Sequence, residues 1–171
     1  MIESHTAWYE SPIGWVRIVA DGTGITAVDF PQRDRTPGAA LPSGPGAPGH
    51  LLECAAQLAE YFEGRRTVFD VRLSLTGTPF QKRVWTALLA VPYGEKTTYK
   101  EIAASLGNVR STRAVGGANH RNPVSIIVPC HRVIGATGGL TGYGGGLWRK
   151  AWLLEHERMH SGARRPPANR A

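Results

Sequence analysis

The sequence contains few cysteines and no long apolar run, and both absences restrict what it can encode. The two cysteines, Cys54 and Cys130, belong to no C-x-x-C pair, so a structural zinc site is disfavoured. No segment approaches the ~18 apolar residues that a membrane span needs. Residues 1–10 also lack the basic and apolar regions of a signal peptide. These absences predict a soluble cytoplasmic protein with free thiols, no bound metal and no membrane partner.

Charge is distributed unevenly along the 171 residues. Up to Phe80 there are six Lys and Arg against nine Asp and Glu, whereas from Gln81 onward there are fourteen against four. A basic half of this kind favours a polyanionic partner such as nucleic acid. A basic surface that serves only solubility is the alternative. The length and the apolar content of 42% suit one domain, or two small domains packed together.

Residues 1–75 predict a small α/β domain. Segments 15–20 and 25–30 are expected to form a β-hairpin, because the Asp-Gly-Thr-Gly sequence between them is typical of a turn. Segment 31–49 is rich in Pro and Gly and is expected to be a loop. Segment 51–63 has one apolar helical face, and segment 67–75 alternates apolar and polar residues as a strand does.

Residues 76–160 predict a mostly helical domain. Thr78 and Gln81, and again Thr98 and Glu101, have the spacing of a capping box, so helices are expected from residue 79 and from residue 99 to about 106. A further helix is expected over 111–119 after a break at Gly107, and a last one over 147–157. The tail, residues 161–171, is expected to be disordered. The predicted fold is thus an α/β N-terminal domain, a small sheet plus a helix, packed on a mostly α C-terminal domain.

The helices expected at 99–106 and 111–119 are joined by a tight turn, which is the helix-turn-helix pattern of DNA-binding proteins. The second helix carries Arg113, and Arg110 and Arg121 flank it. Many helix pairs are only structural, so the local basic charge is what favours DNA binding.

Cys130 is a candidate nucleophile. It follows an apolar run, 124–128, that is expected to be a buried strand or extended segment, and it precedes His131 and Arg132. A free thiol has a pKa near ~8.5, and a neighbouring base and positive charge can generate the reactive thiolate. Adjacent side chains on an extended segment point opposite ways, so this pair needs a tight turn or a bridging water. The alternative is a buried, unreactive cysteine, which is the expectation for Cys54.

Several motifs occur together in a family order and spacing. Pro129-Cys130-His131-Arg132-Val133 resembles the signature of the O6-alkylguanine-DNA alkyltransferases, also called methylated-DNA–protein-cysteine methyltransferases. The resemblance covers about 76–157, and residues 1–75 look like the family's more variable N-terminal domain. The other matching motifs are Thr78-Pro79-Phe80-Gln81, Pro92-Tyr93-Gly94, Thr98-Tyr99, Arg113-Ala114-Val115-Gly116, Asn122-Pro123, Gly142-Tyr143 and Leu153-Leu154 through His156-Glu157.

The resemblance implies DNA repair in which Cys130 takes an alkyl group from O6 of guanine and keeps it, so that each molecule reacts once. His131 would form the thiolate through a water, and Glu157 would orient His131. Asn122 would link the recognition helix to the active-site segment. The base pocket would be lined by Tyr143, Gly144, Val133 and Pro129.

The resemblance also implies the partner, a DNA duplex that contains O6-alkylguanine and is bound through its minor groove by a monomer without a cofactor. The damaged nucleotide would be flipped out of the stack. Arg113 would fill the space of the extruded base, and Tyr99 would assist its rotation and stabilise the departing guanine. Lys100, Arg110 and Arg121 would contact phosphates.

The sequence departs from some relatives at two positions near the expected pocket. Ser125 stands where some have Pro, and Gly144 stands where others have Ser, which leaves the acceptance of bulky alkyl groups open. No ligand set matches the N-terminal zinc site of some relatives. Two other functions remain open from the residues: a helix-turn-helix lesion-binding protein with an inert Cys130, and a Cys-His-Glu hydrolase. Stoichiometric alkylation of Cys130 would separate the alkyltransferase from the lesion-binding protein, whereas a hydrolase would turn over and be indifferent to DNA.

Overall fold

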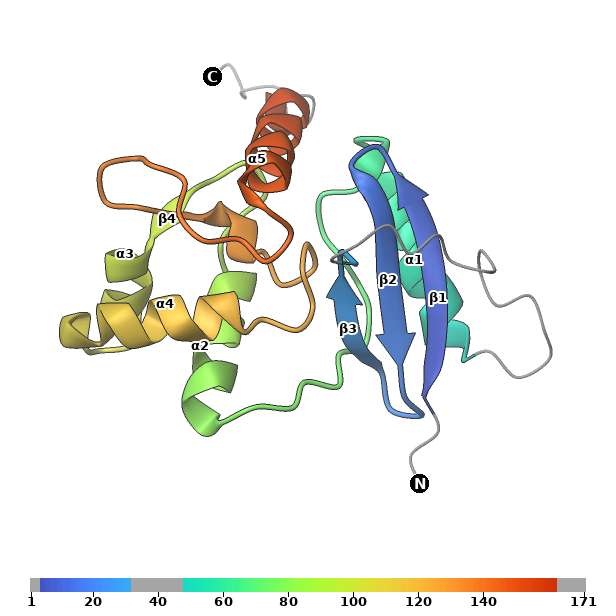
Figure 1. Cartoon of the computed structure of the whole chain (residues 1–171), viewed down its shortest axis with the longest axis horizontal. Helices are drawn as coiled ribbons and strands as arrows, with labels where there is room; N and C mark the ends of the chain where they lie inside the picture. Colours follow the sequence, from blue (N-terminus) through green and yellow to red (C-terminus); the bar gives the residue numbers. More distant parts are fainter. Residues whose placement is uncertain (1–3, 32–47, 163–171) are drawn as a thin grey trace, which may run out of the picture.

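The computed structural model describes residues 4–31 and 48–162, which form two parts lying side by side (Figure 1). The N-terminal part is an antiparallel sheet of β1 (His5–Ser11), β2 (Gly14–Ala20) and β3 (Ile25–Asp29), in that spatial order. Helix α1 (Gly49–Phe62) packs against one face of this sheet. The hairpin of β2 and β3 and the helix were predicted and are confirmed.

Strand β1 was not predicted, and the burial of its side chains explains why. Only Ala7 and Ser11 are buried, so β1 does not show the strict alternation that marks β2, where Val16, Ile18 and Ala20 all face the core. Cys54 lies fully buried on the inner face of α1, as expected of a packing residue.

The strand predicted at 67–75 is wrong, because this segment meets the sheet at one position only. Ile25 donates its N–H to Arg72 O at 2.8 Å, and Ser74 donates its N–H to Ile25 O at 2.8 Å. Further along β3, Val28 bridges Val124 instead, so the pairing with this segment does not continue along the strand. Gly24 allows this close approach, because a Cβ there would lie 2.6 Å from Arg72 O.

The C-terminal part is mostly helical, as predicted. It contains α2 (Pro79–Leu89), α3 (Tyr99–Ser105), the 3-10 turn η1 (Val109–Ser111), α4 (Thr112–His120) and α5 (Leu147–Ser161). Both predicted capping boxes are formed. Helices α3 and α4 pack together across the turn at Gly107, whose φ is +85°, and α2 packs on both. Helix α5 extends four residues beyond its predicted end at Glu157, and residues 163–171 of the tail lie outside the described chain.

The apolar run 124–128 is buried as predicted, but it is not an extended strand. It makes a single bridge to the N-terminal sheet: Val28 donates its N–H to Pro123 O at 2.9 Å, and Ser125 donates its N–H to Val28 O at 2.8 Å. The chain then turns sharply and enters η2 (Cys130–Arg132), followed by β5 (Val133–Ile134), which pairs with β4 (Thr97–Thr98). The edge of the N-terminal sheet therefore supports the segment that leads to Cys130.

Candidate active site

Cys130 stands at the end of two tight turns. The first is centred on Ile126, with a φ of 73°, and is closed by Ile127 N–H donating to Ser125 O at 2.9 Å. The second is centred on Pro129 and is closed by Cys130 N–H donating to Val128 O at 2.8 Å. Turns closed between residues i and i+2 are γ-turns, and the form with positive φ is rare and strained. After these two turns Cys130 is only 5% exposed.

His131 is fully buried and is held by Glu157. Its Nε2 lies 2.6 Å from Glu157 Oε1, and within the described residues its Nδ1 has no hydrogen-bond partner. Arg132 binds the same carboxylate, with Nε 2.9 Å from Oε2 and Nη2 3.0 Å from Oε1. Glu157 is also fully buried, so this carboxylate joins η2 to α5 in the interior of the molecule.

The electrostatics of this group define which atom can act as a base. Burial alone would raise the pKa of the Glu157 carboxyl, but the interactions with His131 and Arg132 outweigh it and hold that pKa well below its usual range. Burial also lowers the pKa of His131, against the opposing pull of Glu157. We therefore assign a neutral His131 whose Nε2–H donates to an ionised Glu157, with Arg132 supplying the positive charge. The lone pair is then on Nδ1, which is the atom available to accept a proton.

The Cys130 thiol is buried, and burial raises its pKa. Hydrogen bonding from Asn122 and the charge of Lys150 act in the opposite direction. Lys150 is fully buried, and its Nζ donates to Val133 O at 2.6 Å and to Thr141 O at 2.7 Å. Burial therefore favours the neutral thiol, so a base must remove its proton before it can attack, and the charge of Lys150 favours the thiolate that results.

Asn122 connects the end of α4 to the segment before Cys130. Its Oδ1 accepts from Val124 N–H at 3.0 Å, and its Nδ2 donates to Val128 O at 2.8 Å. These two bonds span the turn at Ile126, so Asn122 has the geometry of the link that the resemblance implied.

The glycine-rich chain before α5 places Tyr143 against the N-terminal part. The Tyr143 ring is buried and its centroid lies 6.5 Å from that of the Phe30 ring, and Arg149 Cζ lies over the Phe30 ring, 4.8 Å from its centroid. A Cβ on Gly145 would lie 2.7 Å from Phe30 and 2.9 Å from Tyr143, so only glycine fits there. Gly144 is exposed with open space beside it, and Val133 is buried in β5.

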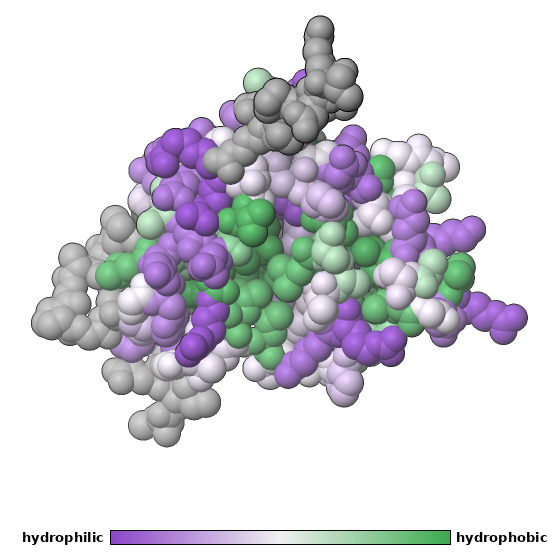
Figure 2. Space-filling model, turned by 180° about the vertical axis from the view of Figure 1, so that it is seen from behind, coloured by the Kyte–Doolittle hydropathy of each residue, from purple (hydrophilic) through white to green (hydrophobic). Residues whose placement is uncertain are grey.

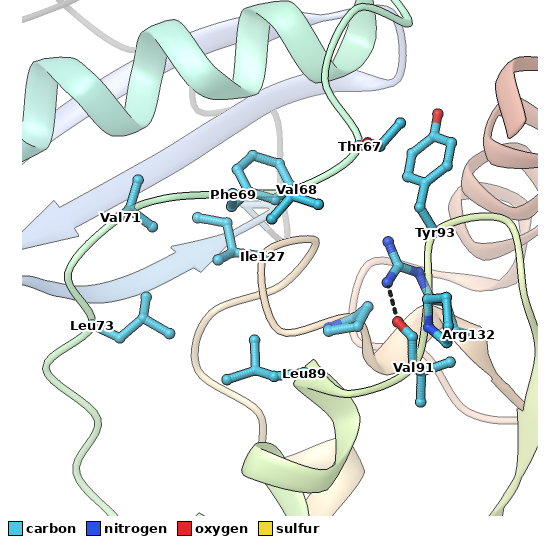
Figure 3. A pocket seen from close by; sticks show the side chains of 12 residues that line it. Thr67, Val68, Phe69, Val71, Leu73, Leu89, Val91, Tyr93, Ile127 and Arg132 are labelled. Atoms are coloured by element: carbon cyan, nitrogen blue, oxygen red, sulfur yellow. Dashed lines mark hydrogen bonds between the residues drawn. The ribbon is translucent and has the colours of Figure 1, made fainter. Parts of the chain in front are cut away.

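Pro129 lines a cavity of about 260 Å³ between the two parts (Figure 3). Cys130, Tyr99 and Tyr143 are not among the residues that line this cavity. Figure 3 shows the Arg132 guanidinium at one end, bonded to Val91 O at 2.6 Å. On the face seen from behind the view of Figure 1, hydrophobic residues gather in the middle (Figure 2).

The predicted DNA-contacting residues share one region of the helical part. Lys100 lies on α3, Arg110 on η1, Arg113 on α4 and Arg121 just after α4, and all four are exposed. Tyr99 begins α3, and its hydroxyl donates to Thr141 O at 3.3 Å. Its ring edge lies within 3.9 Å of the position that a Cβ on Gly116 of α4 would occupy. Tyr99 thus stands between the basic helices and the glycine-rich chain that carries Tyr143.

Two family models match this chain. The model of the 6-O-methylguanine DNA methyltransferase ribonuclease-like domain matches residues 5–75, and the model of the DNA binding domain of the same family matches residues 79–159. The chain belongs to this family.

Individual members are similar over nearly the whole chain. The methylated-DNA–protein-cysteine methyltransferase of Mycobacterium bovis is 47% identical over 161 residues, which is 93% of this chain and 95% of that protein. The Methanosarcina acetivorans protein of the same name is 48% identical over 154 residues, 88% of this chain and 96% of that one. A crystal structure of Mycobacterium tuberculosis OGT in complex with DNA matches with a TM-score of 0.80 at 47% identity, covering 91% of this chain and 94% of that chain. The predicted family and fold are confirmed.

The structure adds residues that sequence reasoning did not assign to the site: Tyr61, Arg132 as the ion-pair partner of Glu157, and Lys150. For Lys150 a signal was available, since it shares the buried face of α5 with Leu153, Leu154 and Glu157 at helical spacing. For Tyr61 there was none, because its partner Glu157 is 96 residues away.

Within residues 4–31 and 48–162, no cluster of three or more His, Cys, Asp or Glu side chains could hold a metal ion. No helix in these ranges is both long and apolar enough to cross a membrane.

Proposed function

We propose that this protein repairs DNA by direct damage reversal, transferring the alkyl group of O6-alkylguanine in duplex DNA to Cys130. The observation that carries the proposal is the buried arrangement around Cys130: Glu157 holds His131 through Nε2 at 2.6 Å, which leaves the Nδ1 lone pair available as a base. This orientation suits removal of the thiol proton through a bridging water.

The transfer itself is an in-line displacement. The Cys130 thiolate attacks the alkyl carbon, the S–C bond forms as the C–O6 bond breaks, and the electron pair stays on the guanine. The proton taken by His131 balances the one that the departing guanine gains. A donor at the base edge lowers the cost of the developing negative charge, and we assign this role to the Tyr99 hydroxyl. The product is a thioether with no easy return path, so each molecule reacts once and consumes no cofactor.

Access to O6 requires the nucleotide to leave the base stack, which costs a few kcal/mol. We assign Arg113 to the space left by the base, and Lys100, Arg110 and Arg121 to phosphates of the minor-groove walls. Tyr143, Gly144 and Val133 would border the flipped base. Residues 1–75 and 76–160 would act as two domains of one monomer in the cytoplasm, the first supporting the Cys130 segment through Val28.

The proposal is tested by titrating a duplex carrying one O6-methylguanine with increasing protein and measuring the O6-methylguanine that remains. We expect repair to stop at one lesion per protein molecule and to vanish in Cys130→Ser. The matched control Cys54→Ser should keep full stoichiometry. Continued turnover would contradict the single-use mechanism. Lesion binding without repair by the unmodified protein would instead favour a helix-turn-helix lesion-binding protein.

A further inference from the structure

The N-terminal part contributes one hydrogen bond directly to the group that holds His131. The Tyr61 hydroxyl, on α1, donates to Glu157 Oε1 at 2.8 Å, and both side chains are fully buried. We propose that Tyr61 is a positioning residue of the Cys130 reaction, whose hydroxyl restrains Glu157 so that His131 stays neutral and ready to accept the thiol proton. The inference rests on the proposed function, because it assigns a role within the same relay.

The hydrogen bonds to Glu157 show why the Tyr61 hydroxyl matters. Glu157 Oε1 accepts from Tyr61 at 2.8 Å, from His131 at 2.6 Å and from Arg132 at 3.0 Å. Glu157 Oε2 accepts from Arg132 at 2.9 Å and from Gly94 N–H at 3.2 Å. A carboxylate has about four lone-pair sites, so these donors share its charge. Each hydrogen bond to the carboxylate therefore weakens the stabilisation that Glu157 gives to a protonated His131.

Without the Tyr61 hydroxyl, Glu157 Oε1 would have one hydrogen-bond donor fewer, and its negative charge would interact more strongly with His131. A more negative Glu157 stabilises the imidazolium, so the pKa of His131 would rise. His131 would then be protonated over more of the neutral range, and a protonated imidazole cannot accept the thiol proton. The loss would be largest at low pH and would shrink as the pH rises.

The other groups around the pair do not replace this contact. Arg132 and Lys150 carry positive charge near His131 and disfavour its protonation. The His156 ring packs 5.4 Å from the Tyr61 ring, and its Nε2 contacts the Tyr61 carbonyl at 2.8 Å rather than the carboxylate. Among the described residues, the other titratable or charged groups that interact with Glu157 or His131 are Arg132, Lys150, His156, Tyr93 and Tyr143.

Tyr93 provides a matched control. Its ring lies 6.0 Å from the Tyr61 ring in a T-shaped contact, and it also faces Glu157. Its hydroxyl is buried but has no hydrogen-bond partner within the described residues. Tyr61→Phe and Tyr93→Phe therefore remove the same atom from neighbouring rings, and only the first removes a donor to Glu157.

The test measures single-turnover methyl transfer from duplex O6-methylguanine between about pH 5 and pH 8, where imidazole titrates. In Tyr61→Phe we expect the acid limb to move to higher pH, with a rate loss of about three- to tenfold near pH 6 that shrinks toward pH 8. Tyr93→Phe should follow the unmodified protein. An equal loss at every pH, or a profile that matches Tyr93→Phe, would overturn the inference.

Two further measurements keep the result interpretable. Titration of His131 by ¹⁵N NMR in the free protein needs no DNA, so it tests Tyr61 even if the unmodified protein transfers no methyl group and the proposed function fails. If Tyr61→Phe does not fold, 3-fluorotyrosine placed at position 61 keeps the ring and makes the hydroxyl a stronger donor. The acid limb and the His131 titration should then move to lower pH, and no movement or the opposite movement would overturn the inference.

Discussion

Replacing Glu157 with glutamine should destabilise the protein strongly, because the substitution leaves a buried cation unpaired. Glu157 is fully buried, and the side chain of Arg132, which makes two hydrogen bonds to it, is only 8% exposed. Breaking a buried pair by removing one partner typically costs about 3–5 kcal/mol. The new amide N–H₂ would also face donors on His131 and Arg132. Against a typical domain stability of about 5–15 kcal/mol, this is a large loss.

The assay is denaturant unfolding at pH 7, with Glu155→Gln as the control. Glu155 also pairs with an arginine, Arg158, but on the exposed surface of the same helix, where screening by water leaves little net stabilisation. We expect a large drop in the unfolding midpoint for Glu157→Gln and almost none for Glu155→Gln. A Glu157→Gln midpoint close to that of the control, at an unchanged slope, would refute the reasoning.

The pH dependence of the same pair has a defined sign. The folded-state pKa of Glu157 lies below its unfolded value of ~4.3, so its stabilisation is complete above that value and is lost as the pH falls below it. The difference in free energy of unfolding between the unmodified protein and Glu157→Gln should therefore be constant above about pH 5 and shrink as the pH is lowered from about 4 toward about 2. A difference that stays constant would contradict the assignment of an ionised Glu157.

Three further predictions concern the pocket wall, the DNA-facing helix and the second cysteine. Gly145→Ala would force a methyl group to within 2.7 Å of Phe30, so it should cost about 1–3 kcal/mol in unfolding free energy. Gly144→Ala has open space and should be neutral within about 0.5 kcal/mol. Arg113→Ala should leave the unfolding midpoint unchanged. In single-turnover assays it should slow repair on the order of tenfold or more, because unstacking the nucleotide costs a few kcal/mol and the arginine would no longer fill the space of the base. An unchanged rate would exclude the role assigned to this side chain. Cys54 should resist alkylating reagents in the native protein up to alkaline pH, since burial raises its pKa to about 12. The Cys130→Ser variant keeps Cys54 as its remaining cysteine, so rapid labelling of this variant, as fast as that of Cys54→Ser, would contradict the prediction.

The sequence predicted those features that depend on neighbouring residues. Thr78 and Thr98 each begin a helix because the side chain that closes the capping box is three residues away. The hairpin of β2 and β3 and the helix-turn-helix likewise follow from local turn residues and apolar spacing. Cys130 and His131 could be proposed because the two residues are adjacent, and the structure places both in the 3-10 turn η2 rather than on an extended strand.

The features that sequence reasoning missed depend on contacts between distant segments. The alternation in 67–75 is real, but this segment bridges β3 only at Ile25, and Val28 of the same strand bridges Val124 instead. The apolar run 124–128 packs in turns because Asn122 bonds both Val124 and Val128 across them. Lys150 and Tyr61 acquire roles only when α5 and α1 meet around the Cys130 segment, and no short-range pattern encodes that meeting.

The central claim is that the alkyl group ends on the Cys130 sulfur. After reaction with one equivalent of a duplex carrying O6-methylguanine, trypsin releases residues 122–132 as one peptide, since Arg121 and Arg132 bound it and Cys130 is its only cysteine. Mass spectrometry of that peptide should show the gain of one methyl group, with fragments that place it on Cys130, in proportion to the lesions repaired. An unmodified 122–132 peptide alongside repaired DNA, or a methyl group on any other residue, would contradict the account.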